Sequence, residues 1–144
     1  MLQYRKLIAE DIKYVKPLID LNLSESVPYL YLLNKIIEKN GFNYVCLFRD
    51  QIVAFLASEL SSQNTLTIEY ICVDKEFRNC GIATDLINII KKDAKKMVSG
   101  IELYVRKDNL KAINFYLKRG FVVLKRDIPY YENGALAFLM SCDV

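Results

Sequence analysis

The chain has 144 residues, of which 53% are hydrophobic and 26% are charged. This length and composition are typical of one globular domain with a single core, so we expect residues 1–144 to form one domain, and they exclude a disordered or collagen-like chain. The formal net charge is +3, from 20 basic and 17 acidic residues. Such a small and dispersed excess argues against a nucleic-acid partner and is compatible with a small anionic ligand.

The first residues lack the basic and apolar regions of a secretory signal, and no apolar run reaches the roughly 20 residues of a membrane helix. We therefore expect a cytoplasmic protein with no membrane partner. Histidine is absent, and the four cysteines, Cys46, Cys72, Cys80 and Cys142, form no CxxC pair. We expect no metal site, and reduced thiols that serve as small apolar side chains. Without histidine, the commonest general base is also missing.

Hydrophobic periodicity and turn residues predict six elements in the first half of the chain. In the order strand, helix, helix, strand, strand, strand, they are Gln3–Leu7, Ala9–Leu21, Pro28 to about Lys39, Asn43–Phe48, Ile52–Leu60 and Thr65–Val73. A turn at Ser24–Pro28 separates the helices, and Asn40-Gly41 ends the second one. The short polar connections between the three strands predict an antiparallel meander.

The second half predicts a helix, a strand, a short helix and two strands. They are Ile82–Met97, Ile101–Arg106, a helix capped by Asp108 or Asn109 that ends at Gly120, Phe121–Arg126 and Ala135–Cys142. The first of these helices carries an apolar stripe at positions 82, 83, 86, 87, 90, 94 and 97, and its lysine pairs at 91–92 and 95–96 predict a solvated face. In the strand, Ile101, Leu103 and Val105 share one face. The order of elements predicts a mixed α/β sheet.

The segment Arg78–Thr84 lies between a strand and a helix, where an anion can bind. The first N–H groups of a helix have no internal partner and lie at the positive end of its dipole. A loop over this end directs several donors at one pyrophosphate, and Gly81 permits a positive φ or a close approach of the backbone. A single glycine is equally typical of an ordinary turn before a helix. Neither a Walker loop nor a GxGxxG pattern is present.

Arg78-x-x-Gly81-x-Ala83 resembles the [RQ]-x-x-G-x-[GA] signature of the GNAT acetyltransferase superfamily. A second stretch, from Leu103–Asn109 through Phe115-Tyr116 to Gly120-Phe121, resembles the second motif of that superfamily. The resemblance implies the GNAT fold, a mixed, mostly antiparallel sheet of about seven strands with splayed central parallel strands and about four helices. It also implies an N-acetyltransferase that moves an acetyl group from acetyl-coenzyme A to a primary amine by direct attack, with no metal.

The resemblance also assigns residues to acetyl-coenzyme A. Main-chain groups of Ile71 and Val73 would hold pantetheine, and an N–H near Cys72 or Val73 would polarise the thioester carbonyl. Asn109 would contact the pantetheine arm. The pyrophosphate would be held by Arg78 and by the amides of the six residues that follow it, which are Asn79, Cys80, Gly81, Ile82, Ala83 and Thr84.

Tyr116 is the general acid that the resemblance implies, protonating the departing thiolate; the alternative is a core aromatic. It follows Asn109 by two helical turns, so both can face the cofactor. Glu69 is one candidate base, because it shares a strand face with Thr67, the position that matches the commonest acid of the family. Tyr104 is the other candidate, since relatives that acetylate protein N-termini carry their base at that position. The alternative for Glu69 is a solvated strand residue.

The tail from Asp127 to Met140 resembles the corresponding segment of ribosomal-protein and N-terminal acetyltransferases. In those enzymes paired tyrosines contact the first residues of a peptide, which makes Tyr130 and Tyr131 candidates for acceptor binding together with Tyr104. Tyr29 is a further candidate, because Val27-Pro28-Tyr29 is loosely like the loop before the second helix of those enzymes.

An α-amine titrates near about 8 and a lysine amine near about 10.4, so the α-amine is the easier nucleophile for a chain without histidine. We therefore expect a peptide or protein α-amine as the acceptor and a monomer or homodimer as the assembly. Three alternatives remain open, one of which is a purely structural protein. The acceptor is a small free amine (a polyamine, an amino acid or an aminoglycoside), or the chain is a coenzyme A-binding module without catalysis.

Overall fold

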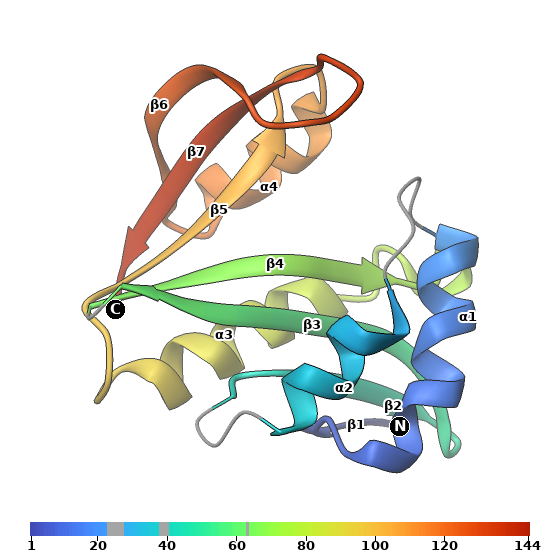
Figure 1. Cartoon of the computed structure of the whole chain (residues 1–144). Coiled ribbons are helices and arrows are strands. Elements are labelled where there is room, and N and C mark those ends of the chain that lie inside the picture. The colour runs from blue at the N-terminus through green and yellow to red at the C-terminus, as the bar shows by residue number, and fades with distance from the viewer. Residues whose placement is uncertain (23–27, 38–40, 63) are drawn as a thin grey trace. The chain divides into compact units, whose positions relative to one another are not determined.

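The computed structural model describes residues 1–22, 28–37, 41–62 and 64–144, and its helices and strands follow the predicted order (Figure 1). The elements are β1 (Leu2–Lys6), a 3-10 helix (Ala9–Asp11), α1 (Ile12–Asn22), α2 (Tyr29–Ile37), β2 (Tyr44–Phe48), β3 (Gln51–Ser62), β4 (Thr65–Val73), a second 3-10 helix (Lys75–Phe77), α3 (Ile82–Ala94), β5 (Gly100–Arg106), α4 (Leu110–Lys118), β6 (Val122–Pro129) and β7 (Leu136–Asp143). The strands form one sheet in the order β1-β2-β3-β4-β5-β7-β6.

The predicted mixed, mostly antiparallel sheet is confirmed. β4 and β5 run parallel, whereas β1 with β2, β2 with β3, β5 with β7 and β6 with β7 run antiparallel. The β4–β5 ladder extends from the pair Thr65 and Gly100 to the pair Ile68 and Leu103. It therefore covers only the first four residues of each strand, as expected for central strands that splay.

Several predicted boundaries differ from those of the structure, such as the strand expected to end at Arg126, which extends to Pro129, and others cannot be compared. The helix expected to reach Met97 ends at Ala94, where a turn follows in which the N–H groups of Met97 and Val98 both donate to the Ala94 carbonyl. Met97 is 44% exposed and lies beyond the helix. Parts of the predicted turn at Ser24–Pro28 and of the predicted helix end at Lys39 and Asn40 lie outside the described residues.

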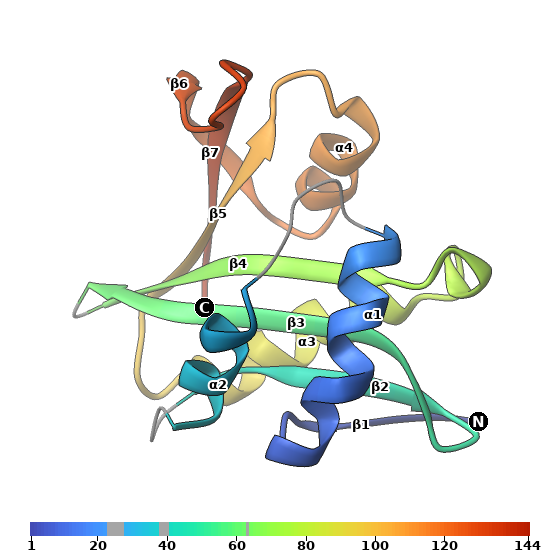
Figure 2. The same cartoon turned by 45° about the vertical axis from the view of Figure 1, so that its right-hand side comes forward.

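The chain divides into two compact units, residues 1–59 with 70–90 and residues 60–69 with 91–144. The expectation of a single domain stays a prediction. In the first unit, α1 and α2 cover one face of β2 and β3, and α3 covers the other (Figures 1 and 2). The core between the first two helices and the strands is built from the side chains of Ile12, Val15, Leu18, Ile19, Leu32, Val45, Leu47, Phe55, Ala57 and Cys72.

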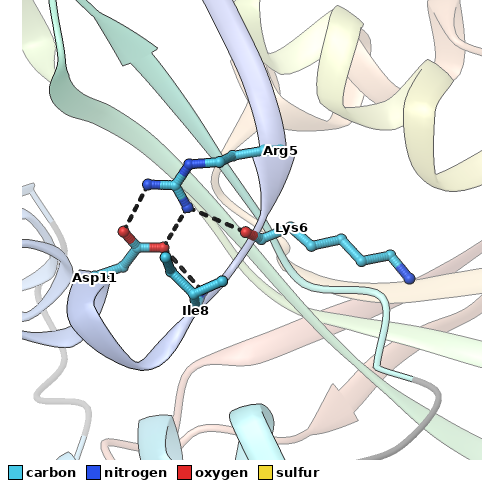
Figure 3. A network of polar contacts seen from close by, with 4 residues as sticks. All are labelled: Arg5, Lys6, Ile8 and Asp11. Atoms are coloured by element: carbon cyan, nitrogen blue, oxygen red, sulfur yellow. Dashed lines mark hydrogen bonds and ion pairs between the residues drawn. The ribbon is translucent and has the colours of Figure 1, made fainter.

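An ion pair joins the end of β1 to the turn that starts α1 (Figure 3). Two guanidinium nitrogens of Arg5 donate to the Asp11 carboxylate at 2.7 and 2.8 Å, and the N–H of Ile8 donates to it at 2.9 Å. Burial by itself would raise the pKa of Asp11, but the hydrogen bonds from Arg5 and Ile8 outweigh it and lower that pKa below its ordinary value. The buried carboxylate therefore stays charged at neutral pH and fixes the start of α1.

In the second unit, α4 lies against β5 and its neighbours (Figure 1). Ile101, Leu103 and Val105 are all buried, as the alternation predicted. Lys91 is an exception to the predicted solvated lysine face, because its Nζ donates to the Arg119 carbonyl at 2.6 Å. The last carbonyls of a helix lack internal donors, and Lys91 supplies one at the end of α4.

All four cysteines are free, and Cys46 and Cys72 are buried as small apolar side chains. Cys80 is exposed, so the prediction was wrong for this thiol, which lies in the loop before α3 rather than in a strand. Across the described ranges, no helix is both long and apolar enough to cross a membrane.

Candidate active site

The path from the end of β4 into the segment Arg78–Thr84 is held by contacts within the first unit. The N–H of Asp74 donates to the Val53 carbonyl at 2.8 Å, and its carboxylate accepts from the N–H of Glu76 at 3.0 Å. The ring of Phe77 packs against that of Phe48 with 5.3 Å between centroids. A short 3-10 turn thereby carries the chain from β4 to Arg78 in one defined conformation.

The loop itself has the features that an anion needs. Asn79 and Gly81 adopt left-handed backbone conformations with φ of 64° and 82°, and α3 begins at Ile82. The N–H groups of the first turn of α3 have no acceptor within the helix. A Cβ placed on Gly81 would meet none of the described atoms within 4 Å, so the glycine borders open space. Main-chain donors, a helix N-terminus and room for an anion therefore occur together, which fits a pyrophosphate.

Arg78 stays close to the exit of β4. It is exposed, and its Nε donates to the Val73 carbonyl at 3.3 Å. The guanidinium thus lies beside the strand whose main chain is predicted to hold pantetheine. This position supplies a positive charge at the start of the loop.

The first turn of α3 is tied to β1 through a pair of polar side chains. The hydroxyl of Tyr4 donates to the Asp85 carboxylate. Burial, and then this hydrogen bond, raise the pKa of Tyr4 above its ordinary value, so the phenol keeps its proton. The carboxylate in the first turn also complements the helix dipole. This hydrogen bond therefore holds the N-terminal end of α3, which follows the loop, to β1.

The side chain of Cys72 lies on the buried face of β4. Its side chain lies in the core, with Sγ 3.8 Å from the Leu18 carbonyl, while Ile71 and Val73 on either side are partly exposed. Burial raises the pKa of Cys72 to about 11, against the opposing charge of Arg78. A protonated, buried thiol is a poor nucleophile, which argues against transfer of the acetyl group through Cys72.

The second unit brings three of the predicted residues together. The ring of Tyr104 stacks on that of Tyr130 with 4.2 Å between centroids and 10° between planes. Tyr131 meets Tyr130 edge-on at 5.0 Å, and the Arg106 guanidinium lies 5.5 Å from the centroid of Tyr131. Tyr130 is 51% exposed. These residues form a surface of aromatic rings and hydroxyl groups, which we call the tyrosine surface (Tyr104, Tyr130 and Tyr131).

Tyr116 is buried between two rings, with centroids 5.3 Å from Phe115 and 5.6 Å from Phe121. Burial raises the pKa of Tyr116 above its ordinary value, and Tyr131 adds to this effect. The phenol therefore remains protonated at neutral pH, as a general acid must. The packing also fits the alternative, a core aromatic.

Three further predicted site residues, Asn109, Glu69 and Tyr29, lie on or directly before three different elements. Asn109 caps α4, its Oδ1 accepting from the N–H of Ala112 at 3.1 Å. Glu69 is partly buried in β4, between the buried Ile68 and the partly buried Tyr70. Tyr29 begins α2 in the first unit and is 55% exposed, while Val27 before it lies outside the described residues.

Glu102 belongs to neither of the two motifs that resemble the GNAT superfamily. Its carboxylate accepts a hydrogen bond from the Thr67 hydroxyl at 3.2 Å, and the two residues are direct partners in the β4–β5 ladder. The strand alternation places Glu102 on the same face as Tyr104. Only the register between two strands that are far apart in the sequence brings Glu102 to Thr67.

The family model described as the acetyltransferase (GNAT) family matches residues 12–121. The chain belongs to the acetyltransferase (GNAT) family. An N-alpha-acetyltransferase of Sulfurisphaera tokodaii is 28% identical to it over 91% of this chain and 86% of that relative.

Two crystal structures have the same fold. Ard1 from Thermoplasma volcanium matches with a TM-score of 0.90 at 26% identity, over 99% of this chain and 97% of that one. The ribosomal-protein-S18-alanine N-acetyltransferase from Escherichia coli matches with a TM-score of 0.88 at 20% identity, over 100% and 94%. The predicted GNAT fold is therefore confirmed, and the protein is an acetyl-coenzyme A-dependent N-acetyltransferase.

Proposed function

We propose that this GNAT enzyme acetylates the α-amino group of a peptide or protein N-terminus. The observation that carries the proposal is the tyrosine surface, in which Tyr130 is stacked on Tyr104 and still half exposed. Stacked tyrosines offer a rigid apolar area together with hydroxyl groups that donate and accept hydrogen bonds, which suits the first residues of a peptide. The N-alpha-acetyltransferase from Sulfurisphaera tokodaii, which is similar along most of this chain, supports the same acceptor.

The first unit is proposed to bind acetyl-coenzyme A. Main-chain groups of Ile71, Cys72 and Val73 would hold the pantetheine and polarise the thioester carbonyl. The pyrophosphate would be bound by Arg78 and by the amides of Asn79, Cys80, Gly81, Ile82, Ala83 and Thr84. Support comes from the positive φ of Gly81, the open space next to it and the N-terminus of α3.

The second unit is proposed to supply the acid and to contact the acceptor. Tyr116 would protonate the departing thiolate, and Asn109 would contact the pantetheine arm. Tyr104 and Glu69 are the candidate bases that the resemblance suggests. Tyr29, in the first unit, is a further candidate for contact with the peptide.

The test is a product screen by mass spectrometry with matched acceptors. One peptide carries a free α-amine and one lysine, a second is the same peptide with its α-amine blocked, and a third set contains polyamines, amino acids and aminoglycosides. We expect a single acetyl group on the α-amine of the first peptide and no product from the second. Acetylation of the blocked peptide or of small amines alone would overturn the proposal. Binding of acetyl-coenzyme A without release of free thiol in any reaction would favour a non-catalytic module.

A further inference from the structure

We propose that Thr67 and Glu102 form the proton-accepting pair of this enzyme, in which the Thr67 hydroxyl takes the proton of the attacking amine and the Glu102 carboxylate takes the proton of Thr67. The proposal rests on the amine acetylation proposed above and adds a base that the sequence motifs do not include. Histidine, the commonest general base, is absent from the sequence, so the base must be another type of residue.

The contact between the two side chains is direct. The Thr67 hydroxyl donates to the Glu102 carboxylate at 3.2 Å, and both side chains are partly buried. The two residues are partners in the β4–β5 ladder, one pair before its last pair, Ile68 and Leu103. The carboxylate is therefore presented at the place where β4 and β5 stop pairing.

The position on the sheet connects the pair to the tyrosine surface. Glu102 and Tyr104 are two residues apart on β5, so they share a face of the strand. Tyr104 in turn stacks on Tyr130. An amine held at the tyrosine surface would thus approach the face of β5 that also carries Glu102.

The Thr67 hydroxyl allows Glu102, a residue of β5, to act as the base. By the GNAT resemblance, the commonest acid of β4 stands at the position of Thr67, and a hydroxyl cannot itself remove a proton at neutral pH. It can pass one on, because an O–H donates and accepts at the same time. Glu102, the partner of Thr67 in the β4–β5 ladder, therefore supplies the carboxylate that an acid on β4 would otherwise provide. Glu69, two residues further along β4, is the competing carboxylate.

The amine attacks the thioester directly. The lone pair of the amine forms a bond to the thioester carbon, and the carbon–sulfur bond breaks with its electrons on sulfur. The amine nitrogen gives one proton to Thr67 Oγ, which gives its own proton to Glu102. The thiolate takes a proton from Tyr116, which regains one from solvent, and Glu102 returns its proton to solvent.

The competing explanation is a cross-strand pair that only stabilises the sheet, which such pairs do by roughly 0.2 to 1 kcal/mol. Four variants separate the two explanations, and a fifth, Glu69→Gln, tests the competing carboxylate. Glu102→Gln keeps the shape and an acceptor oxygen for Thr67 but removes the base, and Thr67→Val removes the relay. Thr65→Val, on the same face of β4, and Asp143→Asn, an exposed acid at the end of β7, are the matched controls.

The measurements are kcat and KM for both substrates from pH 6 to pH 10, with thermal unfolding of each variant. We expect Glu102→Gln to lower kcat about 100-fold and Thr67→Val about tenfold, with the KM for acetyl-coenzyme A unchanged. The deficit of Glu102→Gln shrinks toward pH 10, because hydroxide then takes the proton of the attacking amine in place of the missing carboxylate. Both control variants keep the kcat of the wild type.

An unchanged kcat in Glu102→Gln would overturn the pair. A loss that is equal at every pH and accompanied by a lower melting temperature would also overturn it, since this is the signature of a structural role. If the wild type fails to acetylate N-terminal peptides, the acceptor proposal is wrong, and the pair is decided by the same pH series with the amine that the product screen identifies. A deficit found only in Glu69→Gln assigns the base to Glu69 instead.

Discussion

The ring of Tyr104 in β5 lies parallel to the ring of Tyr130, with 4.2 Å between their centroids. Tyr130 directly follows β6, and the turn that begins there leads into β7, which pairs with β5 and aligns Leu139 with Tyr104. The tyrosine surface is therefore a consequence of the antiparallel β5–β7 and β6–β7 pairings. It gives the proposed acceptor site a rigid support.

Replacement of Tyr130 tests this surface. In Tyr130→Ala the stacking on Tyr104, worth about 0.5–1.5 kcal/mol beyond the buried area, is lost together with the exposed ring. We expect the KM for the peptide to rise about tenfold, which corresponds to about 1.4 kcal/mol, and the KM for acetyl-coenzyme A to stay constant. Steady-state kinetics with each substrate varied in turn provide the measurement. Tyr14→Ala, at an exposed tyrosine of α1, is the control; an equal rise in both variants would contradict a specific surface.

Gly81 and Gly134 form a matched pair for the coenzyme loop. Both have positive φ, 82° and 84°, and neither would place a Cβ against a described atom within 4 Å. An alanine in this conformation costs roughly 1–2 kcal/mol at either position, so both variants should melt at similarly lower temperatures. We expect only Gly81→Ala to weaken the binding of acetyl-coenzyme A, as measured by calorimetry. Equal affinities for the two variants would argue against Arg78–Thr84 as the pyrophosphate loop.

Tyr116→Phe separates the acid from the core aromatic. The phenylalanine keeps the packing against Phe115 and Phe121 but cannot donate a proton. A thiolate is a tolerable leaving group, with a thiol pKa of about 8.5, so we expect kcat to fall about tenfold rather than to vanish. Because the pKa of Tyr116 is raised, ionisation of this phenol should cause no loss of wild-type activity below about pH 10. An unchanged kcat would leave Tyr116 with a packing role alone.

The ion pair between Arg5 and Asp11 predicts a pH-dependent contribution to stability. The pKa of Asp11 is lowered in the folded protein, so its stabilisation is present above the ordinary carboxyl pKa of about 3.9 and is lost as the pH falls through the folded value. We expect Asp11→Asn to lower the free energy of unfolding by about 1–3 kcal/mol at pH 7. Denaturant titrations at pH 7 and pH 3 should show that the difference from the wild type shrinks at the lower pH.

Asp20→Asn is the control for this effect. Asp20 pairs with Lys16 at 2.8 Å one helical turn away, but its side chain is 49% exposed. An exposed pair of this kind contributes about 0.3–0.5 kcal/mol, so the control should be nearly neutral at both pH values. A loss as large as that of Asp11→Asn would mean that burial is not what makes the Arg5 pair effective.

Much of the fold could be predicted because its signals are local. The alternation of Ile101, Leu103 and Val105 and the placement of Gly81 before an apolar helix are visible within one element, and the structure agrees with both. Met97 was assigned to the stripe of α3 by the same periodicity, yet it lies beyond the end of the helix and is exposed. An apolar residue beyond a helix can match the helical period by chance, so the period alone does not show where the helix ends.

The amino-acid sequence by itself determined the family, the order of the elements and the loop that suits a pyrophosphate, since these depend on residue types at short, fixed spacings. The tertiary structure alone decided which distant side chains meet. Thr67 and Glu102 are 35 residues apart and touch because β4 and β5 pair in one register, and Lys91 donates to the Arg119 carbonyl that follows α4. A one-residue slip in register would turn Glu102 to the other face of β5, and no local pattern excludes such a slip.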